Sequence, residues 1–157
     1  MTTVNTDNQE ELVCTQQTRE QWKRRERELS AWVDRDKQVR IPKQTVPLGQ
    51  LDIIVDAELH GALTLLKQLH IPTEFSCAGV SILDDPENHS LYAYITLLAS
   101  EQTDRFIQLA VQRMKHRLLV TYEPARCRYD LSSFYIGHNR SFCLLMEHCA
   151  QRLLRNP

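Results

Sequence analysis

Apolar residues recur in three stretches of the chain at the spacing of one helix face. They are Leu59, Leu63, Leu66 and Leu69 in the first stretch, Phe106, Ile107, Ala110, Val111 and Met114 in the second, and Phe142, Leu145, Met146, Cys149 and Leu153 in the third. Asp56 and Ser100 precede the first two stretches, where N-cap residues are expected. The pattern therefore predicts three helices, each apolar on one side.

Segments with strand character lie between these helices. The sequences LDIIV (51–55) and TEFSC (73–77) read as short strands. In LYAYITL (91–97) apolar residues alternate with Tyr92, Tyr94 and Thr96, which predicts one apolar face and one wetter, aromatic face. LLVTY and CRYDLSSFYI predict two more strands, joined at residues 123–126. From residue 51 onward the expected order is β-α-β-β-α-β-β-α.

The first 40 residues show a different pattern. No Gly or Pro occurs from Thr15 to Val39, and the segment is rich in helix formers, which predicts one long helix over residues 14–40. Residues 1–13 are polar and are expected to form a flexible N-terminus. The helix carries only a narrow apolar stripe, made of Trp22, Leu29, Trp32 and Val33. Such a helix is expected to dock in a groove or on a partner chain.

These elements predict an α+β fold. We expect a two-layer sandwich with a mainly antiparallel sheet of 4–6 strands and helices on one face, formed by a single ligand-binding domain over residues 41–157. The sheet face that carries Tyr92 and Tyr94 needs a cover, which the N-terminal helix or a second subunit could supply. The chain is therefore expected to form a homo-oligomer, a dimer or higher, through that helix.

Composition narrows the classes of function. The formal net charge of −1 argues against a general nucleic-acid binder, because such domains usually carry a basic excess. The five cysteines are scattered and include no CxxC pair, which argues against a disulfide framework or a structural zinc site. The N-terminus has no leader pattern, and no stretch approaches the ~20 apolar residues of a membrane span. We expect a cytoplasmic protein without membrane contact and without a cofactor.

The stretch FSCAGV holds the first candidate chemistry. Cys77 would be a nucleophile only if its pKa were lowered, and a buried small hydrophobe is the favoured interpretation. Gly79 marks a backbone position that needs positive φ or close approach, where exposed amides can hold a phosphate; a plain hairpin corner is the alternative. The acidic segment with Asp84, Asp85, Glu87 and His89 lacks the spacing of a calcium loop, and a solvated loop is the favoured interpretation; a flap over this turn is the alternative.

Basic residues gather around the last strand and the last helix. Arg126 and Arg128 project from the same strand face, and Asn139 and Arg140 begin the helix, whose N-terminal amides favour anions. Solvated surface arginines are the alternative. No known catalytic motif is present, so the expected site is a binding site. Its candidate residues are Phe75, Ser76, Cys77, Gly79, Tyr92, Tyr94, Arg126, Arg128, His138, Asn139 and Arg140.

The leucine-striped helix, IPTEFSCAG, the acidic loop and LYAYITL together resemble two families. VDAELHGALTLL with FSCAGVSILDD looks similar to the tRNA wybutosine-synthesising methyltransferases, although Val80 stands where their motif continues with Arg. The small size, the AYI strand and a final helix that begins near Asn139 and Arg140 resemble phage anti-defence proteins of the anti-Thoeris type, which sequester cyclised ADP-ribose signals. The second resemblance implies tight binding without cleavage, in pockets where protomers meet.

The favoured function is non-enzymatic sequestration of a phosphate-bearing, cyclic nucleotide immune signal, which would inhibit host anti-phage defence. Arg126, Arg128 and Arg140 would contact phosphates, and an aromatic residue would lie under the base. Two alternatives stay open. The first is an S-adenosylmethionine-dependent tRNA-modifying protein, which would make tRNA a partner. The second is a protein–protein interaction module that works through the N-terminal helix.

Overall fold

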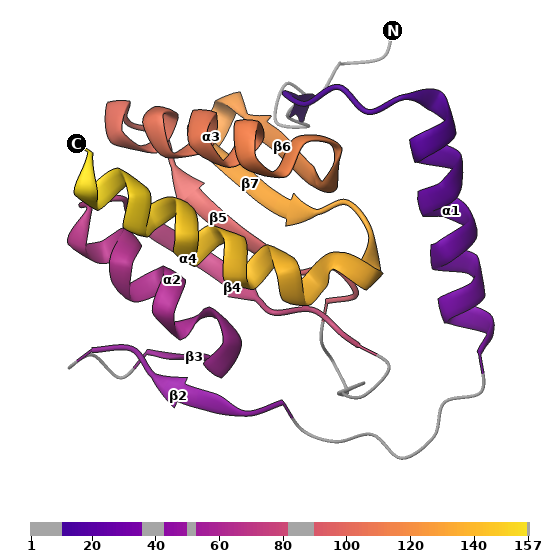
Figure 1. Cartoon of the computed structure of the whole chain (residues 1–157), viewed down its shortest axis with the longest axis horizontal. Helices are drawn as coiled ribbons and strands as arrows, with labels where there is room; N and C mark the ends of the chain where they lie inside the picture. Colours follow the sequence, from indigo (N-terminus) through magenta and orange to yellow (C-terminus); the bar gives the residue numbers. More distant parts are fainter. Residues whose placement is uncertain (1–10, 36–42, 50–52, 82–89, 157) are drawn as a thin grey trace, which may run out of the picture.

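The computed structural model describes residues 11–35, 43–49, 53–81 and 90–156. They form an α+β fold with a five-stranded antiparallel sheet, in the order β1-β6-β7-β5-β4, and a separate two-stranded sheet, β2-β3 (Figure 1). The large sheet contains β1 (Leu12–Val13), β4 (Thr73–Cys77), β5 (Tyr94–Leu98), β6 (Leu118–Glu123) and β7 (Arg128–Ser133). The small sheet contains β2 (Thr45–Pro47) and β3 (Ile54–Asp56). The helices are α1 (Arg19–Asp34), α2 (Ala57–Gln68), α3 (Glu101–Met114) and α4 (Asn139–Arg155).

Within the described residues, three short 3-10 turns complete the connections: η1 (Lys115–Arg117), η2 (Pro124–Arg126) and η3 (Ile136–His138). From β3 onward the order of helices and strands is the predicted β-α-β-β-α-β-β-α. The strand predicted from LDIIV pairs with β2 instead of joining the large sheet. None of the described helices is long and apolar enough to cross a membrane.

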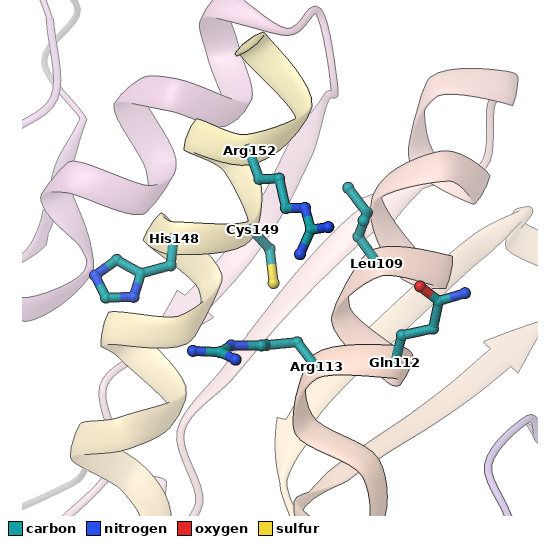
Figure 2. A pocket seen from close by; sticks show the side chains of 6 residues that line it. All are labelled: Leu109, Gln112, Arg113, His148, Cys149 and Arg152. Atoms are coloured by element: carbon teal, nitrogen blue, oxygen red, sulfur yellow. The ribbon is translucent and has the colours of Figure 1, made fainter. Parts of the chain in front are cut away.

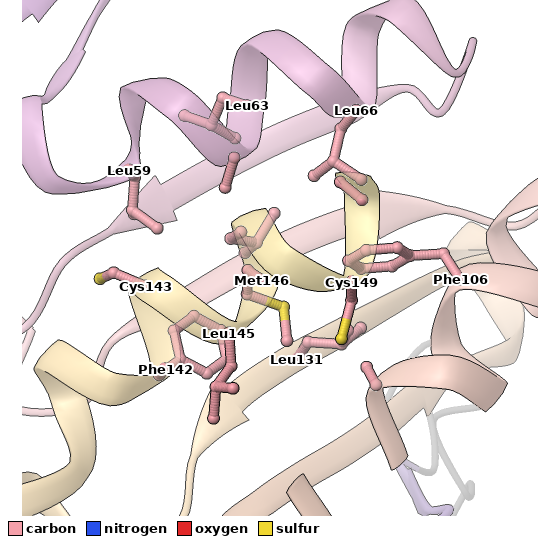
Figure 3. Packing of buried hydrophobic residues seen from close by; sticks show 14 of the residues in the cluster. Leu59, Leu63, Leu66, Phe106, Leu131, Phe142, Cys143, Leu145, Met146 and Cys149 are labelled. Atoms are coloured by element: carbon pink, nitrogen blue, oxygen red, sulfur yellow. The ribbon is translucent and has the colours of Figure 1, made fainter. Parts of the chain in front are cut away.

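The core lies between one face of the large sheet and the helices α2, α3 and α4 (Figure 3). The sheet contributes Ile95, Leu97, Val120 and Leu131, which are fully buried. The helices contribute the residues whose spacing predicted them, including Leu59, Leu66, Phe106, Phe142 and Met146, all fully buried. Each helix packs its apolar stripe on the sheet and leaves its polar side in water, because apolar burial is the main favourable term in folding.

The expected long N-terminal helix is wrong in its extent. The helix α1 begins at Arg19 because Thr18 and Gln21 form a capping box, in which each side chain binds the backbone N–H of the other residue. It ends at Asp34, and Arg35 is already extended. Residues 36–40 of the expected helix lie outside the described part of the chain.

The segment before α1 is a strand instead of a flexible end at Leu12 and Val13. These two residues form β1 and pair with Tyr122 and Thr121 of β6. The N–H of Cys14 then donates to the carbonyl of Val120 at 2.8 Å, which continues the ladder. Leu12 and Val13 were expected in the flexible end and Cys14 at the start of the helix. Pairing with β6 places all three along the sheet instead. The rest of the expected flexible segment, residues 1–10, is outside the described residues.

The helix α1 docks on its own chain. The Trp22 ring meets Phe134 edge-on, with ring centroids 4.9 Å apart, and packs beside Leu119. Leu119 points to the opposite side of β6 from the core residues, because neighbouring residues of a strand alternate. Arg25 donates to the carbonyl of Phe134 at 2.9 Å and lies 3.9 Å from the Tyr92 ring centroid. The cover expected over Tyr92 is therefore α1 of the same chain. The homo-oligomer stays a prediction. Light scattering, which measures the molar mass of the particle in solution, would test it.

Candidate functional site

The FSCAGV turn is fastened to the start of α2. The N–H of Ala78 donates to Oδ2 of Asp56 at 2.7 Å in a buried hydrogen bond. Asp56 occupies the N-cap position of α2, as expected, but its side chain makes no capping hydrogen bond. Cys77 is buried, and this burial raises the pKa of its thiol, which disfavours the reactive thiolate. The favoured interpretation of Cys77 as a small buried residue agrees with this environment.

Gly79 packs against the first residue of α4. Its φ of +76° lies in the region that favours glycine. A Cβ atom at this position would meet the Asn139 amide group and would lie 2.6 Å from the N of Ala93. Positive φ and close approach both occur, as the sequence indicated. The approaching group is the protein's own Asn139 side chain.

The Asn139 side chain is 3% exposed, and its hydrogen-bonding groups are all occupied. Its Oδ1 accepts from the N–H of Ala93 at 2.9 Å and from the hydroxyl of Ser133. Its Nδ2 donates to the carbonyls of Val80 at 2.8 Å and Leu91 at 2.7 Å. Gly79 and Asn139, two candidate site residues, are therefore brought together in a structural junction that joins the turn, β5, β7 and α4.

Arg126 and Arg128 lie at the hairpin between β6 and β7. Arg128 is held between Glu74, at 2.8 Å, and Glu123, at 3.3 Å, and its side chain is only 13% exposed. Arg126 is largely exposed, 3.9 Å from Glu123. Arg140 follows the other end of β7, and six strand residues span about 20 Å. The three arginines expected on one set of phosphates therefore do not meet within one chain.

The aromatic candidates occupy different environments. Phe75 is 57% exposed on β4, with the Arg128 guanidinium 5.8 Å from its ring centroid. Tyr92 lies under Arg25, and its burial raises the pKa of its hydroxyl. Tyr94 pairs with Cys77 across the β4–β5 ladder, one step from Ser76. Of the two tyrosines expected on the wetter strand face, Tyr92 precedes β5 and is covered by α1, whereas Tyr94 lies in β5 beside β4.

His138, the N-cap residue of α4, supports a prediction on pH. Its Nδ1 is buried without a hydrogen-bond partner among the described residues. Burial lowers the pKa of His138, and the charges of Arg117 and Arg24 lower it further. The unfolded chain therefore binds a proton at higher pH than the folded chain, and folding stability decreases as pH falls below about 6.5.

We expect the melting temperature of the wild type to drop more between about pH 7 and pH 5 than that of His138→Gln. Scanning calorimetry of both proteins in buffers of equal ionic strength measures the difference. Parallel pH profiles for the two proteins would contradict the assignment of the effect to His138.

A cavity of about 620 Å³ lies between α1, Ser81 and the start of α4, and we call it the α1 cavity. Its lining residues are Glu28, Ala31, Trp32, Arg35, Ser81, Ile136, Gly137, Asn139 and Arg140. Two of the candidate site residues, Asn139 and Arg140, are among them. The acidic segment for which a solvated loop or a flap was considered, residues 84–89, lies outside the described residues.

Two residues of the lining, Trp32 and Ser81, carry a buried polar atom that has no partner among the described residues. Trp32 is 9% exposed, and its buried Nε1 has no hydrogen-bond partner among the described residues; the same holds for the hydroxyl of Ser81. The Arg35 guanidinium lies 3.7 Å from the Trp32 ring centroid. Glu28 is the acidic residue among the described part of the lining, and it accepts from the N–H groups of Ile136, at 2.6 Å, and Gly137, at 3.1 Å. The cavity therefore offers hydrogen-bond donors and cationic groups next to apolar walls.

Sequence reasoning missed the contribution of α1 to this cavity. Trp32 belonged to the stripe expected to dock, and Arg35 had no place in the expected site. The available signal was an aromatic residue followed three positions later by an arginine, a spacing that places both on one side of a helix. Ser81 carried no signal of its own.

One group of carboxylates in the described part of the chain is close enough to suggest a metal site. Ligand atoms of Glu11, Glu123 and Asp130 lie within 4.8 Å of one another. Glu123 is engaged by Arg128, and Asp130 accepts a hydrogen bond from the hydroxyl of Thr96. Glu123 and Asp130, the two carboxylates of the sheet, therefore have partners within the protein, and their positions need no bound cation.

Comparison with protein-family models, with curated proteins and with solved structures finds no match to this chain.

Proposed function

We propose that the protein binds a phosphate-bearing nucleotide in the α1 cavity and releases it unchanged. The observation that carries the proposal is the arrangement of a Trp32–Arg35 stack and Arg140 around one cavity of about 620 Å³. Small-molecule sites usually occupy about 300–1,000 Å³ and combine apolar walls with a few polar groups. The lining of the α1 cavity has this composition.

The Trp32 side supplies a place for a base. Arg35 lies on the Trp32 ring, and a guanidinium plane of this kind can stack on a nucleobase. Trp32 Nε1 and the Ser81 hydroxyl can donate to acceptors on the base or the ribose, since neither has a partner among the described residues. An unpaired buried donor is costly, so a ligand that satisfies it gains affinity.

The α4 side supplies a place for phosphate. Arg140 lies in the first turn of α4, a helix of 17 residues whose start receives no hydrogen bond from a side chain of its N-cap residue. The N-terminus of a helix carries a partial positive charge, and an arginine can bind a phosphate through two parallel hydrogen bonds. The helix N-terminus and Arg140 both favour a negatively charged group at the α4 end of the cavity.

The lining supports binding more than catalysis. Among the described lining residues the carboxylate is that of Glu28, which is engaged by two backbone N–H groups, and the other polar side chains are guanidinium, indole, hydroxyl and amide groups. Cys77, the candidate nucleophile, is not part of the lining and has a raised pKa. Sequestration of a cyclised ADP-ribose signal is the form of this function that the resemblance to anti-defence proteins implies.

A thermal-shift screen followed by titration calorimetry tests the proposal. The panel holds cyclic nucleotides, cyclised ADP-ribose products, S-adenosylmethionine and tRNA. A ligand at 100 times its Kd stabilises the folded state by about 2.7 kcal/mol. That is about 5–10 °C in melting temperature for a domain of this size. Chromatography of the bound ligand afterwards should recover it unchanged.

Substitutions of lining residues test whether such a ligand binds in the α1 cavity. Arg140→Gln should weaken its binding by about 10- to 100-fold, and Trp32→Phe by about 5-fold, because the first removes a charged donor and the second a neutral one. Arg27→Gln on the exposed side of α1 removes the same charge and should leave affinity unchanged.

Two results would contradict the proposal. One is a nucleotide whose affinity is the same for the wild type, Arg140→Gln and Trp32→Phe. The other is turnover of the bound nucleotide. A shift with S-adenosylmethionine, together with methyl transfer to tRNA, would favour the methyltransferase alternative. If no compound of the panel raises the melting temperature, the result would favour the protein-interaction alternative.

A further inference from the structure

A second concave surface lies between α3 and α4, and we call it the α3–α4 groove. It measures about 410 Å³ and is lined by Leu109, Gln112, Arg113, His148, Cys149 and Arg152. None of these residues lines the α1 cavity. Arg152 lies twelve residues after Arg140 on α4, a distance of about 18 Å along a helix. The groove is therefore separate from the site of the proposed function.

Two arginines from different helices extend over this groove. Figure 2 shows Arg113 of α3 and Arg152 of α4 on either side of the Cys149 sulfur. Neither guanidinium has an ion pair in the part of the chain that the structure describes, and no carboxylate is among the lining residues. Glu147, next to His148 on α4, places its carboxylate against Gly61 of α2. The positive charge of the groove is therefore not neutralised by the residues around it.

The floor of the groove adds no negative charge. Cys149 is 4% exposed, and burial raises the pKa of its thiol, although Arg113 and Arg152 act in the opposite direction. The thiol is therefore neutral near pH 7 and does not repel an anion. Gln112 and His148 offer further hydrogen-bonding groups at the rim, and Leu109 is apolar.

We propose that the α3–α4 groove binds a small phosphate-bearing anion between Arg113 and Arg152. Each planar guanidinium can bind phosphate oxygens through two hydrogen bonds, and two such groups on facing helices can hold one phosphate or diphosphate from both sides. The volume of the groove matches a small molecule. A nucleic acid would need a longer basic surface, and the net charge of the chain is −1. This inference does not depend on the function proposed for the α1 cavity.

Titration calorimetry with inorganic pyrophosphate at low ionic strength tests the groove. Arg113→Gln and Arg152→Gln should each weaken binding on the order of 10-fold or more, because each removes a charged pair of donors. Arg27→Gln is the matched control, since it removes the same charge from an exposed position of α1.

Chemical-shift mapping locates the binding independently of the variants. Backbone amide signals of residues 109–113 and 148–152 should move on addition of pyrophosphate, while the melting temperatures of both groove variants stay within about 2 °C of the wild type, because their guanidinium groups are solvated.

Three results would overturn the proposal. The first is the absence of binding to the wild type at low ionic strength. The second is an equal loss of affinity in Arg27→Gln, which would indicate an unspecific charge effect. The third is displacement of pyrophosphate by a single-stranded RNA oligonucleotide that binds the same residues more tightly, which would assign the groove to nucleic acid.

Discussion

Replacing Gly79 by alanine is expected to lower the melting temperature by about 10 °C, which corresponds to about 3 kcal/mol of folding free energy in a domain of this size. The φ of +76° disfavours any residue with a Cβ atom. That atom would also lie 2.6 Å from the backbone N of Ala93 and would meet the Asn139 amide. The backbone of Ala93, directly before β5, is held by hydrogen bonds to Asn139 and Ser133 and cannot move aside at low cost, so both effects act against the variant. Thermal and urea denaturation measure the loss.

Gly61→Ala is the matched control for this substitution. Gly61 lies inside α2, where alanine is favoured over glycine by about 1 kcal/mol. Its Cβ would meet the carboxylate of Glu147, the end of a flexible side chain that can turn away. We expect a change within about 1 kcal/mol in either direction. Equal losses for the two variants would show that the approach of Gly79 to Ala93 and Asn139 does not constrain the fold.

Replacing Asn139 by alanine is expected to cost about 4 kcal/mol. The amide serves the carbonyls of Val80 and Leu91 and the N–H of Ala93, and removing it leaves these backbone groups without partners in the interior. Each unsatisfied buried group costs about 1–3 kcal/mol. Urea denaturation at constant pH measures the change in the free energy of unfolding.

Ser133→Ala is the control for Asn139, because it removes one hydroxyl bonded to Oδ1 and leaves the other hydrogen bonds of the amide in place. Its expected cost is about 1 kcal/mol. The double variant Gly79→Ala with Asn139→Ala should cost less than the sum of the single variants, since the clash between the new Cβ and the amide is then absent. Two results would contradict the role of this junction in stability. One is that the losses of the two single variants add up to the loss of the double variant. The other is that Asn139→Ala loses no more free energy of unfolding than Ser133→Ala.

This junction also bears on the α1 cavity. Val80, the residue after Gly79, packs with Trp32 and Ile136 in one small buried cluster. Trp32 and Ile136 line the cavity, and Asn139 begins the helix that carries Arg140. The FSCAGV turn therefore contributes to the proposed site by holding its walls in place. The positive φ of Gly79 and its contact with Asn139 explain why glycine stands at this position, without a direct contact to a ligand.

The periodicity of apolar residues determined most of the elements. Phe106, Ala110 and Met114 predict α3 because residues three or four apart share a helix face, and they are fully buried on the sheet. Ser100 caps that helix through the N–H of Thr103, as its position indicated. The alternation at Ala93, Ile95 and Leu97 identified the core face of β5. These features depend on residues close in sequence, so local pattern suffices to find them.

Tertiary structure decided which polar residues meet. Arg128 pairs with Glu74, 54 positions away, and Asn139 binds the carbonyl of Val80 at a separation of 59. Both were candidate ligand residues because an arginine or an amide near a helix start can bind an anion, and their actual partners depend on how distant strands are ordered in the sheet.

The docking of α1 was likewise set by distant groups, whereas its start follows from the local capping box of Thr18 and Gln21. The carbonyl of Val120 and the N–H groups of Ile136 and Gly137 hold the segment from Cys14 to Glu28. By itself the sequence determined the order and the inward faces of the helices and strands, because hydrophobic periodicity is local. Which polar groups are occupied, and which still face a cavity, depends on pairings over long separations that no local pattern encodes.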